Sequence, residues 1–323
     1  MNRMSGQHGS DFALQTTRLE LSTHFEESRV EDALTIRFRA QSDAPWTLLA
    51  VHGYSDNSHT WHRLTTMTRN LSGRLVAIDL PGHGESPFRA DLARDYVDHG
   101  ARLTLSLLER VAPGRPAILV ANSLGGAVAL RALARQVDAV DAPIRAALLL
   151  SPATPDTRRP PFVRLKRAGL YRAAEWSRRW MPRSIYRRAT RFLLNKATEM
   201  ALSRTEGIDP AWRDSRLDSL CRPGSWLALE AIAGEVDRLL SSKDDPKTAQ
   251  TWERLARIDV PVIVQRGAED PIVGTPELLD LVARLPRAEF QELPGIGHCP
   301  QLEAPDLVES ALRRLLEDSG LPS

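Results

Sequence analysis

Short apolar runs alternate with segments of helical periodicity through the first half of the chain. Residues 48–51, 75–78, 117–121 and 146–150 are runs of four or five consecutive apolar residues. Such runs are too short for helices and are typical of strands buried on both faces. The stretches between them, such as residues 102–110, have a helical pattern. This alternation predicts an α/β fold with a doubly wound, mostly parallel sheet covered by helices on both faces.

The pattern changes at the start and in the middle of the chain. Alternating apolar and polar residues at 12–21 and 33–39 predict two antiparallel strands that open the sheet. No apolar strand run occurs from Ser151 to about Ser242, where the pattern is helical and interrupted by prolines, and strand character resumes at Val260. We therefore expect an inserted helical cap. The predicted divisions are a flexible tail at 1–11, the first part of the core at 12–153, the cap at 154–250 and the second part of the core at 251–323.

A serine interrupts the apolar run at the point where a strand is followed by a helical pattern. Residues 119–126 read Leu-Val-Ala-Asn-Ser-Leu-Gly-Gly, and good helix formers continue from 127 to 133. The chain must turn sharply at Ser123. In a strand-to-helix elbow a serine hydroxyl projects beyond the sheet, and neighbouring glycines let the backbone approach closely. Ser123 is therefore a candidate nucleophile, whereas an ordinary turn is the alternative.

Two further strand ends carry residues that suit a serine nucleophile. An apolar strand after Pro261 leads to Asp270, and a strand after Phe290 leads to His298 in a loop. Either residue alone could belong to an ordinary turn. The chain order Ser123, Asp270, His298 at three strand ends, however, predicts a catalytic triad in the order found in α/β-hydrolases.

Two more segments carry a resemblance to that superfamily. Residues 48–54, Leu-Leu-Ala-Val-His-Gly-Tyr, resemble its strand and oxyanion loop, and residues 79–86, Asp-Leu-Pro-Gly-His-Gly-Glu-Ser, resemble its Asp-x-Pro-Gly-x-Gly-x-Ser turn. The chain is thus similar to the branch with a helical cap that contains esterases, C–C bond hydrolases and perhydrolases. Ala121 stands where the usual Gly-x-Ser-x-Gly elbow has its first glycine. Alanine adds only a methyl group to glycine, so we expect the elbow to tolerate it. A serine at 123 argues against epoxide hydrolases and haloalkane dehalogenases, which carry an aspartate there.

The resemblance also implies roles for individual residues. His298 would take the Ser123 proton, and Asp270 would orient the imidazole. The backbone N–H groups of Tyr54 and Leu124 would stabilise the oxyanion. The remaining polar residues of the two loop motifs, such as His52 and Asp79, are expected to hold turns, with Asp79 accepting hydrogen bonds from backbone amides.

Composition indicates a water-soluble enzyme without a cofactor. The chain has 323 residues, 42% of them hydrophobic, and a formal net charge of +2. No apolar stretch reaches the length of a membrane span, and the N-terminal residues do not resemble a secretory signal, so we predict a cytoplasmic protein. The two cysteines, Cys221 and Cys299, do not form a metal-binding or disulfide pattern. We expect no metal, no cofactor and no nucleic-acid partner.

An arginine-rich stretch in the predicted cap has two interpretations. Residues 157–191 contain twelve basic residues and a single acid, Glu175, interleaved with aromatic and aliphatic side chains. This stretch could form an electropositive entrance that attracts an anionic substrate, a carrier-bound acyl group or a membrane surface. Alternatively it is a solvated face whose arginines pair with the acids that follow, such as Asp214 and Asp218.

The reaction that these residues favour is hydrolysis of a carboxylic ester of a small-molecule acyl substrate. A serine triad and an oxyanion loop are sufficient for that reaction. C–C bond hydrolysis uses the same residues, but Cys299 follows the histidine where those enzymes commonly have tryptophan. A thioesterase or acyltransferase acting on a carrier-bound chain is another alternative, and a ligand receptor on a hydrolase scaffold is an alternative of another class. The sequence leaves the acyl group, the alcohol and the oligomeric state open.

Overall fold

A computed structural model describes residues 15–25, 28–38, 44–90, 93–242 and 244–322. The predicted tail at 1–11 lies outside these residues, as do Phe12 and Arg39 at the ends of the two predicted opening strands.

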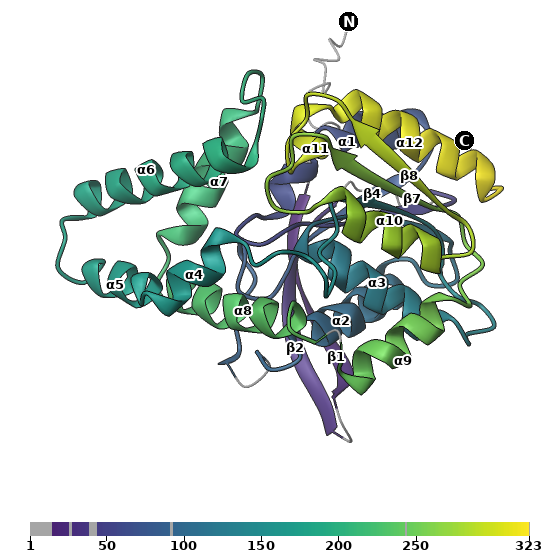
Figure 1. Cartoon of the computed structure of the whole chain (residues 1–323), viewed down its shortest axis with the longest axis horizontal. Coiled ribbons are helices and arrows are strands. Elements are labelled where there is room, and N and C mark those ends of the chain that lie inside the picture. Colours follow the sequence, from purple (N-terminus) through teal and green to yellow (C-terminus); the bar gives the residue numbers. More distant parts are fainter. Residues whose placement is uncertain (1–14, 26–27, 39–43, 91–92, 243, 323) are drawn as a thin grey trace, which may run out of the picture.

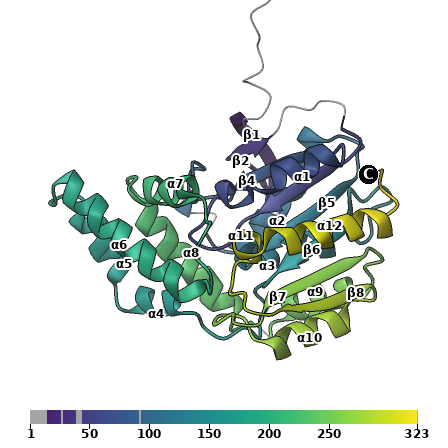
Figure 2. The same cartoon turned by 90° about the horizontal axis from the view of Figure 1, so that it is seen from above.

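One sheet forms the centre of the molecule (Figures 1 and 2). Its strands are β1 (Gln15–Phe25), β2 (Ser28–Phe38), β3 (Thr47–Val51), β4 (Arg74–Asp79), β5 (Ala117–Asn122), β6 (Ile144–Leu150), β7 (Val262–Gly267) and β8 (Ala288–Leu293). They lie in the order β1-β2-β4-β3-β5-β6-β7-β8. Six adjacent strands, β4, β3, β5, β6, β7 and β8, are parallel to one another. Strand β1 pairs antiparallel with β2, and β2 pairs antiparallel with β4. The predicted α/β fold with a mostly parallel sheet is confirmed.

Helices cover both faces of the sheet. The core helices are α1 (Leu64–Asn70), α2 (Tyr96–Val111), α3 (Leu124–Gln136), α9 (Pro246–Leu255), α10 (Thr275–Arg284), α11 (Pro300–Glu303) and α12 (Pro305–Asp318), with a short 3-10 turn η1 (Ser58–Trp61). Successive residues of β3 face opposite sides: Leu49 and Val51 pack with α2, α3 and α10, whereas Leu48 and Ala50 pack with α1 and α12. This alternation explains why the runs at 48–51, 75–78, 117–121 and 146–150 are apolar throughout, since both faces of the sheet are buried at these strands.

A helical insertion lies between β6 and β7. Its helices are α4 (Pro161–Arg167), α5 (Leu170–Ser177), α6 (Arg183–Ala201), α7 (Pro210–Leu220) and α8 (Ser225–Leu239). These five helices are called the insertion below, and they project to one side of the sheet (Figures 1 and 2). They share a small apolar core of their own that includes Tyr171, Leu194, Leu217 and Leu229. Residue 250, where the sequence places the end of the cap, lies within α9.

Candidate active site

Ser123 occupies a sharp elbow between β5 and α3. Its backbone has φ 53° and ψ −116°, in the left-handed region that residues with a side chain seldom adopt. The elbow also brings α3 very close to β3, because a Cβ at Gly125 would lie 2.4 Å from the carbonyl oxygen of Val51. Only glycine fits at that position. Strained backbone of this kind concentrates at functional sites and lifts the serine off the end of the strand.

Asp270 and His298 meet at the same edge of the sheet. Asp270 follows β7 and His298 follows β8, and His298 Nδ1 lies 2.8 Å from Asp270 Oδ2. The second carboxylate oxygen accepts hydrogen bonds from the Ile272 amide at 2.8 Å and the Val273 amide at 3.2 Å. Both side chains are buried. The site therefore holds the carboxylate in a fixed orientation toward the imidazole.

The pKa of Asp270 is lowered although burial opposes ionisation. Burial by itself raises it, but the nearby His298, the hydrogen bond from His298 and the Ile272 amide together outweigh burial. The carboxylate is thus ionised at neutral pH. Since an ionised carboxylate only accepts, His298 donates from Nδ1, which leaves Nε2 of a neutral imidazole free to accept a proton.

Asn122 connects the serine elbow to the histidine loop. Its Nδ2 donates to the carbonyl oxygens of Leu150 and of His298, both at 3.1 Å. The amide of His298 in turn donates to the carbonyl of Ala201, the last residue of α6, at 2.8 Å. The residue before the serine and the last residue of α6 therefore fix the backbone of His298. Sequence reasoning gave Asn122 no role, although a polar residue at the end of a buried strand is a signal.

The loop after β3 passes directly beside the serine. A Cβ at Gly53 would lie 3.2 Å from the Cβ of Ser123 and 2.9 Å from the Oδ1 of Asn122, so the loop requires glycine there. Tyr54 follows. Among the described residues, the amides of Tyr54 and Leu124 donate to no backbone carbonyl, and Leu124 begins α3, where amides have no partner within the helix. Neither amide thus has a backbone acceptor, one of them directly after the serine and the other directly after Gly53.

Two neighbouring polar residues hold the loops. The ring of His52 has both nitrogens engaged: Nδ1 donates to the Gly53 carbonyl at 2.7 Å, and Nε2 accepts from the Leu80 amide at 3.0 Å. Asp79 accepts from the amides of Ser58 at 2.7 Å and Glu85 at 2.9 Å. These contacts confirm the predicted turn role of Asp79 and leave His52 without a free nitrogen to act as a base.

The Tyr54 side chain attaches the loop after β3 to the insertion. Its hydroxyl lies 2.7 Å from the hydroxyl of Tyr171 on α5 and 3.0 Å from the carbonyl of Leu229 on α8. Its ring stacks on Phe162 of α4 with a centroid separation of 4.0 Å. Burial raises the pKa of Tyr54 well above its ordinary value and that of Tyr171 to about 12, so both hydroxyls are protonated. Three insertion helices thus hold this one side chain.

Helix α7 makes a second connection to the same loop. Trp212 Nε1 donates to Asp56 at 2.8 Å, and Arg216 donates to the Ser55 carbonyl at 3.0 Å. The Arg216 guanidinium also lies over the Trp212 ring, 4.7 Å from its centroid. All these groups except Ser55 are buried. The loop that carries the Tyr54 amide is therefore fixed by α7 as well as by the aromatic contacts of α4 and α5.

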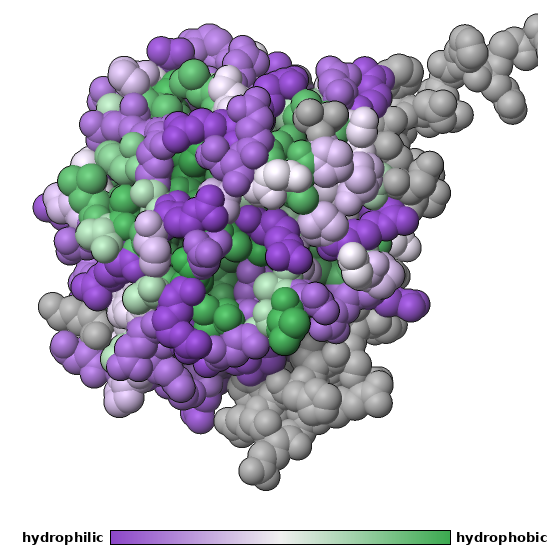
Figure 3. All heavy atoms as spheres, turned by 90° about the vertical axis from the view of Figure 1, so that its right-hand side faces the viewer, coloured by the Kyte–Doolittle hydropathy of each residue, from purple (hydrophilic) through white to green (hydrophobic). Residues whose placement is uncertain are grey.

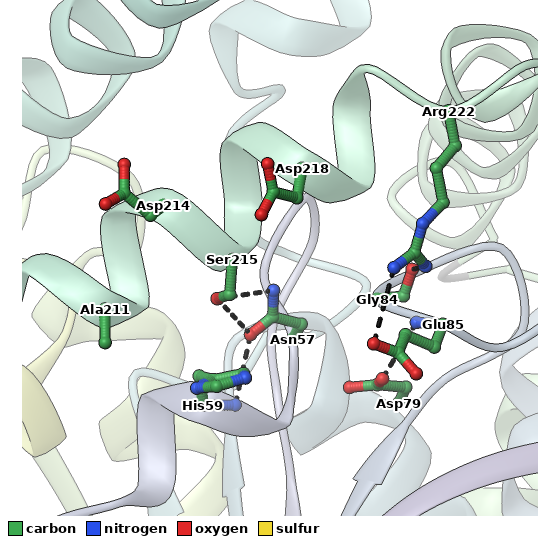
Figure 4. A pocket seen from close by; sticks show the side chains of 10 residues that line it. All are labelled: Asn57, His59, Asp79, Gly84, Glu85, Ala211, Asp214, Ser215, Asp218 and Arg222. Atoms are coloured by element: carbon green, nitrogen blue, oxygen red, sulfur yellow. Dashed lines mark hydrogen bonds and ion pairs between the residues drawn. The ribbon is translucent and has the colours of Figure 1, made fainter.

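A polar cavity of about 350 Å³ lies at the junction of α7 with the core (Figure 4). Its lining residues are Asn57, His59, Asp79, Gly84, Glu85, Ala211, Asp214, Ser215, Asp218 and Arg222. Ser123, Asp270 and His298 do not line it. Asp214 pairs with Arg191 and Asp218 pairs with Arg187, so arginines of the protein itself neutralise the two carboxylates. Within the described residues no cluster of three or more His, Cys, Asp and Glu side chains could hold a metal ion.

Comparison with known proteins agrees with this architecture. The model of the alpha/beta hydrolase family matches residues 48–311. Lipase LipV of Mycobacterium tuberculosis is 34% identical over 34% of this chain and 38% of its own length, so the chain spans little more than a third of that relative. The pimeloyl-[acyl-carrier protein] methyl ester esterase of Nitrosomonas europaea is 28% identical over 80% of this chain and 91% of its own.

A solved structure extends the likeness to the fold of nearly the whole chain. The thermophilic esterase from Thermogutta terrifontis superposes with a TM-score of 0.67 and 20% identity, covering 94% of this chain and 99% of that one. The predicted superfamily is confirmed. With a family match that spans most of its length and a sheet of the same architecture, the chain belongs to the alpha/beta hydrolase family.

Proposed function

We propose that the chain is a serine hydrolase that cleaves a carboxylic ester through Ser123, His298 and Asp270. One observation carries the proposal: His298 is hydrogen-bonded to Asp270 through its side chain, and Asn122 ties the backbone of His298 to the Ser123 elbow. The names of the relatives, a lipase and a methyl ester esterase, support ester hydrolysis.

In this mechanism Ser123 Oγ attacks the carbonyl carbon of the ester while Nε2 of His298 takes the hydroxyl proton. Negative charge develops on the carbonyl oxygen, where the amides of Tyr54 and Leu124 would donate hydrogen bonds. Each such donor typically stabilises the transition state by about 3 kcal/mol. Asp270 keeps the imidazole in the correct tautomer and stabilises the imidazolium that forms.

The intermediate then collapses. The bond from the carbonyl carbon to the alcohol oxygen breaks, and His298 returns its proton to the leaving alkoxide, which leaves an acyl group on Ser123. Water attacks this acyl-enzyme with His298 again as the base, and the carboxylic acid departs. Apart from the attacking water, these side chains and amides are sufficient for the two half-reactions.

A second class of substrate fits the same reaction. A methyl ester on a carrier-bound acyl chain is favoured by the relative from Nitrosomonas europaea, because that match spans 91% of the relative's length. We also propose that the insertion acts as the cap that the sequence predicts and bounds the acyl pocket. The contacts of Tyr54 with Tyr171 and Leu229 support this placement.

Labelling with a fluorophosphonate tests the nucleophile. The probe should add to Ser123, and Ser123→Ala should lose both labelling and turnover of p-nitrophenyl esters. Ser86→Ala is a matched control, because its hydroxyl already donates to the Asp79 carbonyl at 2.6 Å. Labelling that persists in Ser123→Ala would refute the assignment. A chain-length series of esters beside acyl thioesters and a carrier-bound methyl ester would then identify the acyl and leaving groups.

A further inference from the structure

The end of the α5–α6 hairpin carries large apolar side chains that the molecule leaves exposed. Figures 1 and 2 show this hairpin protruding from the rest of the molecule. Trp176 and Trp180 are 63% and 72% exposed, with ring centroids 6.1 Å apart. Ile185 and Phe192 on α6 are 53% and 61% exposed. By contrast, polar residues predominate on the opposite face of the molecule (Figure 3).

Helix α6 has one buried face and a second face that exposes apolar side chains. The buried stripe comprises Tyr186, Thr190, Leu194 and Thr198, which recur at every fourth position. The exposed stripe comprises Ile185, Phe192, Leu193 and Met200, which also follow helical spacing. An amphipathic surface helix normally presents one apolar stripe to the core and a polar face to water. The second stripe is therefore available to something outside the chain.

Arginines without an acidic partner accompany the exposed tryptophans. Four arginines of the α5–α6 hairpin are paired: Arg172 with Glu230, Arg178 with Glu175, Arg187 with Asp218 and Arg191 with Asp214. Arg179, Arg183 and Arg188 form no ion pair with any described residue. These three lie beside Trp180 and along the first turns of α6. The two interpretations of the arginine-rich stretch thus apply to different residues, and the hairpin end keeps net positive charge.

We propose that the end of the α5–α6 hairpin docks on an anionic phospholipid bilayer. Tryptophan side chains favour the depth of the lipid headgroups, and arginines bind headgroup phosphates through charge-assisted hydrogen bonds. An anionic leaflet attracts basic residues that lie near its surface. A second copy of the chain is disfavoured here, because two such surfaces would bring Arg179, Arg183 and Arg188 toward their equivalents. A protruding end also provides no concave site for a small ligand.

In this arrangement the exposed stripe of α6 lies along the interface, with the apolar side chains directed into the headgroup region. Of the helices in the described ranges, none combines the length and the apolar character that crossing a membrane demands. Docking depends on surface residues alone, so it is independent of turnover at Ser123.

Sedimentation of the full chain with lipid vesicles tests the proposal. We expect the protein to bind vesicles of phosphatidylcholine with about 30 mol% phosphatidylglycerol, and phosphatidylcholine vesicles at least tenfold more weakly. The triple variant Arg179→Gln, Arg183→Gln, Arg188→Gln and the double variant Trp176→Ser, Trp180→Ser should each lose about tenfold or more in binding to the anionic vesicles. Tryptophan emission of the wild type should shift to the blue on binding.

The matched control is Arg94→Gln, Arg110→Gln, Arg145→Gln, which removes the same charge from exposed arginines of the core. It should keep wild-type binding, and all variants should keep the wild-type melting temperature. Absence of binding to the anionic vesicles, or an equal loss in the control, overturns the proposal. So does dimerisation that the tryptophan variant abolishes, or binding of an acidic carrier protein in place of vesicles. Hydrolysis of a soluble ester is measured separately, so failure of docking and failure of the proposed function are distinguishable.

Discussion

The edge of the sheet and the end of the α5–α6 hairpin hold their side chains in opposite ways. At the sheet edge, Asp270 receives two backbone amides and one imidazole N–H, and His298 is fixed through both its side chain and its backbone. At the hairpin end, Trp180 and Arg183 extend into solvent. The first region is organised by contacts within the chain, which suits chemistry that needs a fixed geometry. The second leaves Arg183 without an ion pair to any described residue and Trp180 largely exposed, which suits recognition.

The largest effect is expected where the sheet edge is most tightly organised. Asp270→Asn should lower kcat by about 10⁴-fold, because an amide at this position stabilises the wrong tautomer of His298. The control Glu269→Gln changes the adjacent carboxylate and should stay near wild type. Turnover of p-nitrophenyl acetate measures both variants, and near-normal kcat in Asp270→Asn would mean that another group orients the histidine.

The second prediction concerns how the free energy of unfolding depends on pH, through the buried His83. Burial, followed by the nearby His52, lowers the pKa of His83 well below its ordinary value, with the Pro81 carbonyl opposing them. The unfolded chain binds a proton below about pH 6.5 while the folded protein does not. The free energy of unfolding should therefore fall by up to about 1.4 kcal/mol per pH unit on acidification from about pH 6.5.

Urea unfolding between about pH 7 and pH 5 measures this slope. His83→Gln should flatten this slope, whatever its effect on stability at neutral pH. Identical slopes in wild type and His83→Gln would show that the folded protein accepts a proton at this position.

A smaller effect on kcat is expected at the contact between Tyr54 and Tyr171, which joins the loop after β3 to the insertion. Tyr171→Phe removes the hydroxyl that lies 2.7 Å from that of Tyr54, and so loosens the loop whose amide would meet the oxyanion. One hydrogen bond contributes about 1 kcal/mol, so kcat should fall about fivefold with little change in KM. Tyr186→Phe is the control, because its hydroxyl binds Trp226 Nε1 away from that loop. A change confined to KM would assign Tyr171 to substrate binding.

The smallest effect tests whether the arginines also attract substrate. If they steer an anionic ester, raising the salt concentration from about 0.01 to 0.5 M should lower its kcat/KM by about two- to threefold, since screening shortens the range of the field. A neutral ester of similar size should respond little. Equal responses of the two esters would restrict the role of the free arginines to docking.

The sequence predicts features that depend on residues close together in the chain, and it does not predict contacts between distant residues. The strands, the elbow at Ser123 and the positions of Asp270 and His298 follow from short apolar runs and turn residues. The contact of Tyr54 with Tyr171 joins residues 117 positions apart, and no local pattern reports it. Periodicity also could not separate Tyr171, which is buried, from Trp176, which is exposed, because both belong to amphipathic helical segments. Only the packing of α5 on α8 decides between them.

The hydrogen bond from the His298 amide to Ala201 restricts how this molecule could admit a substrate. Helix α6 has 19 residues and is about 28 Å long, with the exposed tryptophans near its first turn and the proposed base at its last. A rigid outward swing of the insertion would pull this carbonyl away from the histidine loop. After such a swing, only the contacts with Asn122 and Asp270 would hold His298, so the open enzyme would align its base less well than the closed one.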